Sequence, residues 1–511
     1  MFAAQQRPRR EGGLRVAATA ALGFVAIFAV AGCSHATLST PASIVSAAYE
    51  GAAGANAMLA PQALDRWWTL FDDAQLTTLV EGALEASPSA RQARERIAEA
   101  RAVRAQTLSG YDPQGNLSGS AQRQTTDQSF GNTGITTGAT GAGSTGSTGT
   151  GAAFLTPAGT LSTFGAQFNV SYEIELFGRR RTAARAADAD VAAARFDYEG
   201  VRATLARDVA FGLFQARCAS IQLADATETL RIASELEKSR RVSAERGLTS
   251  TGDLARMETD SANARAEAAR LEATSRTTRR SLLALTGRGG AALDTLTVQP
   301  VAGVPPAPPA LTPADLLRRR PDVRQAAARL QSAAGNLDLD KLGLLPKFAF
   351  APGGSVSRTT GTYDSTTSLW SLALNATLPV LDRPRLLAVV RAQRARGEQA
   401  VAAYEIAVMN GYRDAENGFA ALEADRARVA ALTVVVDRSR VAFDAARKGF
   451  DLGLTDLTTL LDSERAWRTA RAALTAAQTT ALVDAATLFQ ALGGGWNATS
   501  APPGAPVVAS R

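Results

Sequence analysis

Two segments of the chain alternate apolar and polar residues with a period of two. They are residues 164–181, "FGAQFNVSYEIELFGRRR", and residues 369–381, "LWSLALNATLPVL". Successive side chains of a strand point to opposite faces, so each segment predicts a strand with one apolar and one polar face. We expect these strands at about 162–177 and 368–381. Both are long enough to cross a bilayer at a tilt.

A weaker strand is expected before each of these two, at about 114–125 and 347–358, where Phe348, Phe350 and Val356 are the clearest apolar positions. A tract rich in Gly, Ser and Thr, at about 126–160, separates the first pair. Because such a tract cannot bury enough apolar surface to order itself, it predicts a flexible surface loop.

Long helices are predicted for most of the remaining chain. Residues 179–246 contain no proline and only two glycines, which allows one helix of about 100 Å at 1.5 Å per residue. A similar helix is expected at 385–448, and shorter ones at 253–287 and 456–492. The last of these has apolar residues every seven positions, the spacing of a coiled coil, at Leu460, Trp467, Leu474, Ala481 and Leu488.

The chain contains an internal duplication. "PSARQARERI" at 88–97 matches "PDVRQAAARL" at 321–330, and "RGLTS" at 246–250 matches "LGLTD" at 452–456. A duplication of this length predicts two copies of a helix, strand, strand, helix, helix unit, at 66–297 and 314–496. The proline-rich segment 298–313 predicts a stiff, extended linker between them.

The N-terminal segment has the pattern of a secretion signal. Four arginines precede an uncharged run at 16–33 that ends in "VAGC". This resembles a bacterial lipoprotein signal at 1–32, with Cys33 as the lipidated residue, and Ser34 after it suggests sorting to the outer membrane. A plain signal or a membrane anchor is the alternative. We expect 33–65 to form a lipid-anchored tail and 497–511 a C-terminal tail.

Composition excludes several classes of function. The 511 residues carry a net charge of +7, but the arginines alternate with acids rather than with aromatic side chains, so no nucleic-acid partner is predicted. Two cysteines, Cys33 and Cys218, and one histidine, His35, are too few for a zinc cluster, a disulfide framework or a histidine-based catalytic triad. The sequence therefore predicts no enzyme, no cofactor and no metal site.

The helices cannot bury the apolar strand faces, because two long helices point away from each strand pair. A bilayer would cover them if no strand edge stayed unpaired, since orphan backbone groups in hydrocarbon cost several kcal/mol each. Four strands are too few to close a barrel with a useful lumen. Copies of the chain are therefore expected to share one barrel, of twelve strands for three chains or sixteen for four.

Several spaced motifs resemble the TolC-like outer-membrane factors, and especially their lipoprotein branch. They are "RWWTLFDDAQLTTLVEGAL" at 66–84, "SYEIELFGRRR" at 171–181, "LLRRRPDVRQAAARL" at 316–330, "LPVLDRPRL" at 378–386, "FDLGLTDLTTLLDSERAW" at 450–467 and "ALGGGW" at 491–496. The resemblance covers nearly the whole mature chain. One departure is that Arg383 and Pro384 stand where the family usually has Gly-Gly.

The resemblance implies a mainly α fold with transmembrane β, in which a homotrimer forms a twelve-stranded β-barrel continued by a long α-helical coiled-coil barrel in the periplasm. It implies a lipid-anchored protein of the bacterial outer membrane that passively conducts drugs or other small amphiphilic solutes out of the cell. The implied partners are outer-membrane lipid, a periplasmic adaptor (membrane-fusion) protein and an inner-membrane transporter of the RND class. The expected lipid-facing side chains are Phe164, Phe168, Val170, Tyr172, Trp370, Leu372 and Leu374.

The resemblance also implies a periplasmic gate near the turn at Gly453, formed by Leu457, Asp462 and Arg465. Asp462 and Arg465 share a helix face, although a solvated surface pair is the alternative. The first-copy turn, residues 247–253, has Arg256 and Glu258 at the equivalent places and is expected to form the outer pair, in contact with the adaptor.

Two alternatives to drug efflux remain open from the sequence. One is another export channel of the same architecture, such as a type I protein-secretion duct. The other is a lipid-anchored periplasmic coiled-coil scaffold that spans no membrane.

Overall fold

The computed structural model describes residues 48–51, 61–126, 159–300, 303–309, 311–361 and 364–497. These all lie in one compact unit, Thr40–Arg511. The predicted signal, Cys33, most of the Gly/Ser/Thr tract and nearly all of the C-terminal tail lie outside the described residues, so the predictions made for them are not tested.

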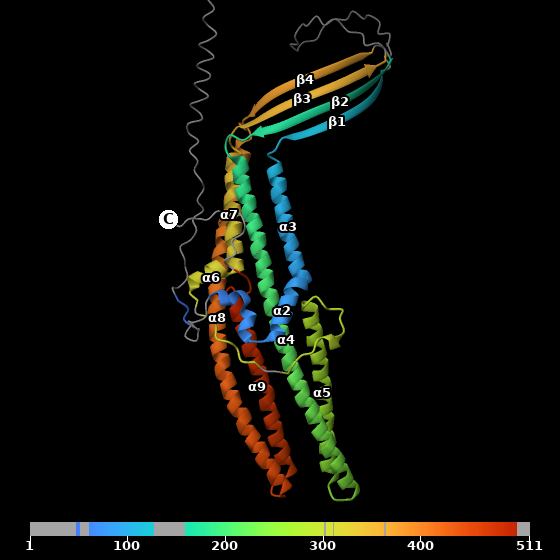
Figure 1. Ribbon diagram of the computed structural model, residues 1–511, viewed down its shortest axis with the longest axis vertical. Coiled ribbons are helices and arrows are strands. Elements are labelled where there is room, and N and C mark those ends of the chain that lie inside the picture. Colours follow the sequence, from blue (N-terminus) through green and yellow to red (C-terminus); the bar gives the residue numbers. More distant parts are fainter. Residues whose placement is uncertain are drawn as a thin grey trace, which may run out of the picture. The chain divides into compact units, whose positions relative to one another are not determined.

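The element order repeats once along the chain (Figure 1). The first copy consists of the 3-10 helix η2 (Pro61–Phe71), α2 (Ala74–Ala86), α3 (Pro88–Ser109), β1 (Gln114–Thr126), β2 (Gly159–Ile174), α4 (Arg179–Glu245) and α5 (Thr251–Leu285). The second consists of α6 (Pro313–Arg319), α7 (Pro321–Leu342), β3 (Lys347–Thr360), β4 (Ser365–Thr377), α8 (Arg383–Asp451) and α9 (Leu457–Ala491). A short helix, η3 (Leu293–Thr295), lies between them. The expected strands and long helices are present, with ends shifted by a few residues.

Local sequence explains several of these ends. Asp73, Ser250 and Asp456 are N-caps whose side chains accept a backbone N–H of the first turn. Pro384 stands in the first turn of α8, where the missing N–H leaves no helix hydrogen bond unmade. The departure from Gly-Gly at 383–384 is thus compatible with a helix start.

Two glycines show that the duplication extends to tertiary packing. Gly287 and Gly493 both have a left-handed backbone, with φ of 74° and 80°. A Cβ on Gly287 would lie 2.8 Å from the carbonyl oxygen of Ala86, and one on Gly493 would lie 2.7 Å from the carbonyl carbon of Arg319. Each contacted residue stands two positions before the proline that begins α3 or α7. The same close packing, of a glycine after the last helix against the residues before α3 or α7, therefore occurs in both copies.

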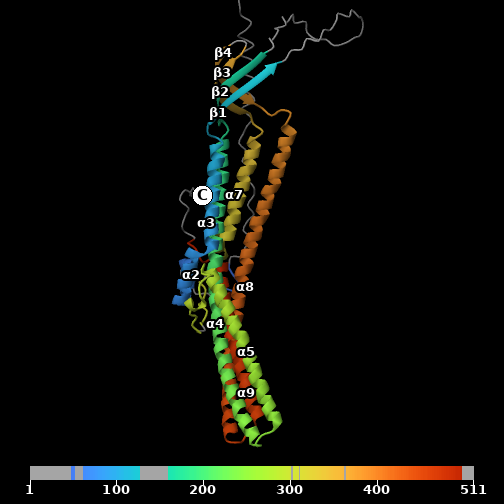
Figure 2. The same cartoon turned by 90° about the vertical axis from the view of Figure 1, so that its right-hand side faces the viewer.

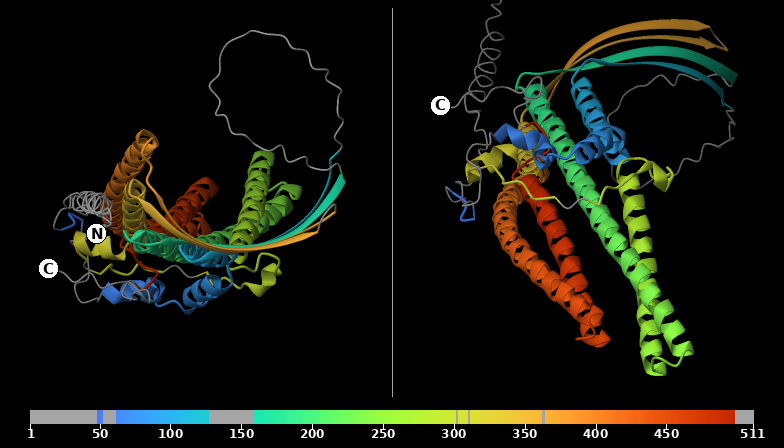
Figure 3. Two further views of the ribbon diagram at one scale, coloured as in Figure 1. Left: turned by 90° about the horizontal axis from the view of Figure 1, so that it is seen from above. Right: turned by 60° about the horizontal axis from the view of Figure 1, so that its bottom comes forward.

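The four strands form one antiparallel sheet in the order β1-β2-β3-β4, so that the two copies are joined by the pairing of β2 with β3. The sheet is curved (Figure 3). β1 and β4 are its edge strands and have no further partner within the described residues.

The helices pack in two hairpins, α4 with α5 and α8 with α9, and α3, α4, α7 and α8 follow one another as packed neighbours (Figure 2). No helix among the described residues combines the length and the apolar character needed to cross a membrane.

The main core lies where η2 and α2 meet α4, α5 and α9. Trp67 is fully buried and its ring lies 5.9 Å from that of Phe489. Two ion pairs tie this N-terminal region to the helices, Arg217 with Asp73 and Arg319 with Asp65. The indole of Trp496 donates to the carbonyl oxygen of Arg319 at 2.9 Å. The motif at 66–84, which contains Trp67, and the motif "ALGGGW" at 491–496 thus pack together in this core.

Candidate functional site

The strand register collects the apolar side chains of all four strands on one face of the sheet. One row across the sheet runs from Leu117 through Phe168 and Gly354 to Trp370. Directly paired residues of antiparallel strands share a face, so these rows are continuous stripes. A second row joins Tyr172, Phe350 and Leu374. All seven predicted lipid-facing residues lie on this face. Each of them is even-numbered on β2 or β4, and the register pairs the even-numbered residues of β2, β3 and β4 with one another.

This apolar face is open in the isolated chain. Trp370 is 84% exposed, Leu372 74% and Phe168 49%. Monomeric soluble proteins rarely leave an apolar patch of this extent uncovered. The face is therefore built to meet another apolar phase.

The opposite face of the sheet is polar. Its residues are mainly Ser, Thr, Asn and Gln, including Asn116, Ser118, Gln167, Asn169, Ser355 and Asn375. Gln167 donates to Asn169 within this face at 3.0 Å. Alternation along each strand thus separates an apolar wall from a hydrogen-bonding wall.

The predicted gate residues lie at the tip of the second hairpin. Gly453, with φ of 72°, makes the turn, and Leu457 is the first residue of α9. The guanidinium of Arg465 donates to Asp462 at 3.2 Å, as their shared helix face predicts. It also donates to Asp260 of α5 at 3.4 Å.

The contact with Asp260 was not foreseen from the sequence. It joins the tip regions of the two hairpins across a cavity of about 400 Å³ that is lined by both α5 and α9. Asp260 carries no local pattern that marks it as a partner for a residue 205 positions away. Only the placement of the hairpins brings the two together.

Arg256 and Glu258, at the equivalent places of the first hairpin, both lie in α5 and do not pair with each other. Residues two apart on a helix point in different directions. Glu258 accepts instead from Arg241 of α4 at 3.0 Å, within the first hairpin.

A second ionic link joins the hairpins away from the tips. Arg471 of α9 donates to Asp225 of α4 at 2.6 Å, and its guanidinium lies 5.1 Å from the centre of the Trp467 ring. Trp467 in turn stacks on Phe443 of α8 at 5.4 Å. Burial raises the pKa of Asp225, against the opposing effect of Arg471. The heptad position of Trp467 is thus part of a contact between α8 and α9.

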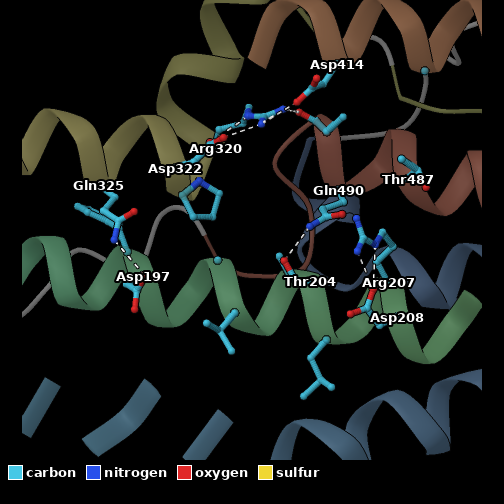
Figure 4. A pocket seen from close by; sticks show the side chains of 18 of the residues that line it. Asp197, Thr204, Arg207, Asp208, Arg320, Asp322, Gln325, Asp414, Thr487 and Gln490 are labelled. Carbon is cyan, nitrogen blue, oxygen red and sulfur yellow. Dashed lines mark hydrogen bonds and ion pairs between the residues drawn. The ribbon is translucent and has the colours of Figure 1, made fainter. Parts of the chain in front are cut away.

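A cavity of about 770 Å³ lies between α4 and the second copy (Figure 4). Its polar side chains are bonded to one another. Arg320 donates to Asp322 and Asp414, Gln490 to Thr204, and Gln325 to Asp197. Burial alone would lower the pKa of Arg320, but the two aspartates outweigh it and raise the pKa. These bonds hold α4, α7, α8 and α9 in place around the cavity.

Two acids meet inside the second hairpin. Asp425 of α8 is 8% exposed and its Oδ2 has no hydrogen-bond partner among the described residues. It neighbours Asp484 of α9, whose pKa is raised to about 6, first by burial and then by the hydrogen bond and charge of Asp425. With the offset that aligns the two copies, the same places in the first hairpin hold Ala219 and Thr278. The acid pair therefore belongs to the second hairpin alone.

No cluster of three or more His, Cys, Asp or Glu side chains suited to a metal is found in the part of the chain that the structure describes. Cys218 is buried and unpaired by disulfide.

A sheet with one apolar and one polar face, joined to long helical hairpins, defines a subunit of a membrane channel with an aqueous helical extension. The chain belongs to the outer membrane efflux protein family, whose sequence profile matches residues 79–288 and 312–494. This family consists of channel proteins.

Two relatives span nearly the same length. The pyoverdine export outer membrane protein OpmQ of Pseudomonas putida is 28% identical over 85% of this chain and 89% of its own. The outer membrane protein OprJ of Pseudomonas aeruginosa is 27% identical over 91% of this chain and 93% of its own.

Solved structures of the same fold include the CmeC outer membrane channel of Campylobacter jejuni. It has a TM-score of 0.74 at 18% identity and covers 91% of this chain and 95% of its own. The open state of the MtrE outer membrane channel of Neisseria gonorrhoeae has a TM-score of 0.72 at 23% identity, covering 91% and 98%. The TolC-like fold inferred from the sequence is confirmed.

Proposed function

We propose that this chain is the outer-membrane exit duct of a tripartite efflux pump, conducting drugs or other small amphiphilic solutes passively to the exterior. The observation that carries the proposal is the strand register, which places the apolar residues of both copies on one face and polar residues on the other. The apolar face meets lipid, and the polar face lines water.

Three subunits complete the duct. β1 and β4 both end the sheet with unpaired backbone groups, and hydrocarbon does not tolerate such edges. In a trimer, β4 of one subunit pairs with β1 of the next, which gives twelve strands and leaves no edge. The long helices continue the wall of the duct into the periplasm.

The duct works with a periplasmic adaptor and an inner-membrane transporter of the RND class. It performs no bond chemistry and uses no cofactor. Cys33 carries the lipid anchor that holds the N-terminus at the outer membrane. Mass spectrometry of the mature N-terminus tests this point, and an unmodified terminus away from Cys33 would contradict it.

The gate lies at the tip of the α8–α9 hairpin. Leu457 narrows the opening, and Asp462 and Arg465 hold the tip shut. The bond from Arg465 to Asp260 supports this role, because it restrains α9 against the other hairpin of the same subunit.

Spin labels on the sheet test the proposal. Labels at Phe168 and Leu372 are expected to report lipid, whereas labels at the neighbouring positions Gln167 and Ser371 are expected to report water. The reverse pattern would rule out the duct. The scaffold alternative predicts a salt-released monomer, whereas the duct predicts heat-resistant trimers in outer-membrane fractions.

The cargo distinguishes a drug-efflux duct from a type I protein-secretion duct of the same architecture. Deletion of the chain is expected to lower resistance to amphiphilic drugs while leaving protein secretion intact.

A further inference from the structure

Two arginines interrupt the apolar face of the sheet, and both lie toward the strand ends that are remote from the helices. Arg358 of β3 is paired with Phe164 of β2, and Arg123 of β1 is paired with Ser162. Phe164 and Ser162 are both even-numbered on β2, so the two arginines lie on the same face as the apolar rows.

They are the only charged residues of that face within the described strands. Both side chains are exposed, and neither makes a hydrogen bond or ion pair with another described residue. By contrast, Arg179, at the helix end of the sheet, pairs with Glu173 at 3.5 Å. Asp364, six residues after Arg358, precedes β4 and is exposed as well, and Asp127, four residues after Arg123, lies outside the described residues. Within the part of the sheet that the structure describes, the two arginines are thus cations without an acidic partner beside an apolar wall.

Their height on the sheet matches one edge of a bilayer. From Ile174 to Phe164, β2 spans about 33 Å at about 3.3 Å per residue. A strand tilted by about 40° converts this to an apolar band about 25 Å tall, as in outer-membrane barrels. The row of Phe164 contains Arg358, and the next row outward contains Arg123. Both guanidinium groups therefore lie where hydrocarbon gives way to headgroups on the side away from the helices.

We propose that Arg123 and Arg358 form a binding site for the phosphate groups of a phosphorylated glycolipid in the outer leaflet. The inference rests on the proposed orientation of the sheet in the membrane. Guanidinium groups bind phosphate bidentately and form strong charge-assisted hydrogen bonds. The two backbone positions lie two strands and one pleat repeat apart, about 12 Å, within reach of a single headgroup that carries two phosphates.

The site also explains why the arginines lack acidic partners. An acid beside them would neutralise the pair internally and would itself be exposed to the negative headgroups. With no such acid among the described residues of the sheet, the lipid supplies the counter-charge, and three subunits place three such sites around the barrel.

The test is binding of a bisphosphorylated glycolipid to the purified, detergent-solubilised trimer. The double variant Arg123→Gln/Arg358→Gln is expected to bind it at least about tenfold more weakly than the unmodified protein, a difference of about 1.4 kcal/mol. Lys347→Gln is the matched control, because it removes a positive charge from the other face and the other end of the sheet. This control is expected to bind as the unmodified protein does.

Three further probes separate the sources of binding. The dephosphorylated glycolipid and phosphatidylethanolamine are expected to bind the unmodified protein and the double variant equally weakly. Equal binding of the phosphorylated glycolipid to both proteins would overturn the proposal. Competition by inorganic phosphate alone at millimolar concentration would replace the lipid site with a simple anion site, and would overturn it as well.

Failure of this inference is distinguishable from failure of the duct. The spin labels at Phe168 and Leu372 report lipid whether or not the arginines bind phosphate. The double variant is expected to form trimers that conduct ions normally in planar bilayers.

Discussion

Asp425 of α8 and Asp484 of α9 are neighbouring acids inside the second hairpin, and burial together with the nearby Asp425 raises the pKa of Asp484 to about 6. Arg207 and Asp208, which line the neighbouring cavity from α4, are paired with each other, and Arg320 is paired with Asp322 and Asp414. The charge of the acid pair is therefore not neutralised by a cation from these elements.

This pair makes the stability of the trimer depend on pH. The folded pKa of Asp484 is about 6, above the ordinary value of 3.8, so the folded hairpin binds more protons than the unfolded chain between these values. The contribution of Asp484 to stability is therefore expected to rise as the pH falls through about 6. We expect Asp484→Asn to remove part of the gain in Tm between pH 7.5 and pH 5.5, by roughly 1–3 °C.

The control for this prediction is Asp437→Asn, which removes the same charge from an exposed position of α8. It is expected to leave the pH dependence as it is in the unmodified protein. An Asp484→Asn variant with an unchanged pH profile would show that the pair does not share a proton.

Loss of the link between the hairpin tips is expected to open the gate. Arg465→Ala and Asp260→Asn both remove the 3.4 Å contact between α9 and α5, and Asp462→Ala removes the 3.2 Å contact within α9. All three should raise single-channel conductance in planar bilayers. Stability should change by less than about 1 kcal/mol, since exposed pairs contribute little. Arg440→Ala, which breaks only a pair within α8, should conduct normally.

The close approach at Gly493 predicts a severe effect from one methyl group. Gly493→Ala combines a left-handed backbone with a Cβ placed 2.7 Å from the backbone of Arg319. Gly178→Ala has the same backbone strain, with φ of 71°, but open space around the added atom. We expect a loss of about 1–2 kcal/mol at Gly178 and clearly more at Gly493. Equal losses in urea unfolding would contradict the packing argument.

Glu416 of α8 holds a short N-terminal stretch in place. Its carboxylate accepts the backbone N–H groups of Glu50 at 2.8 Å and Gly51 at 3.2 Å, while the ring of Tyr49 stacks on Tyr412 at 5.8 Å. Burial raises the pKa of the Tyr49 hydroxyl above its usual value. We expect Glu416→Ala to speed hydrogen exchange of the Tyr49–Gly51 amides by about tenfold or more, with no change in the sheet. Glu423→Ala, on the same helix, is the control.

The strands were predictable because their signal is local. Two-residue alternation fixes both the extended conformation and the face of Phe168 or Trp370, and the duplication fixes how many such segments to expect. Proline-free runs of alanine and arginine likewise defined the long helices within a few residues. These features depend on residues that are close together along the chain, so they can be read from the sequence.

The partners of the gate and the acid pair were not predictable in the same way. Asp260 and Arg465, like Asp425 and Asp484, lie far apart in sequence and meet only through helix packing. That the first-copy turn forms the outer pair stays a prediction. Whether Leu457 forms a constriction stays a prediction.

The wall of hydroxyl and amide groups on the polar side of the sheet carries only two charged residues, Glu173 and Lys347, of opposite sign and both near the helices. In a barrel with this side inward, the part of the path formed by the described strands offers little fixed charge to favour anions over cations. Discrimination among cargoes by charge is therefore expected from the proteins that load the duct rather than from these strands.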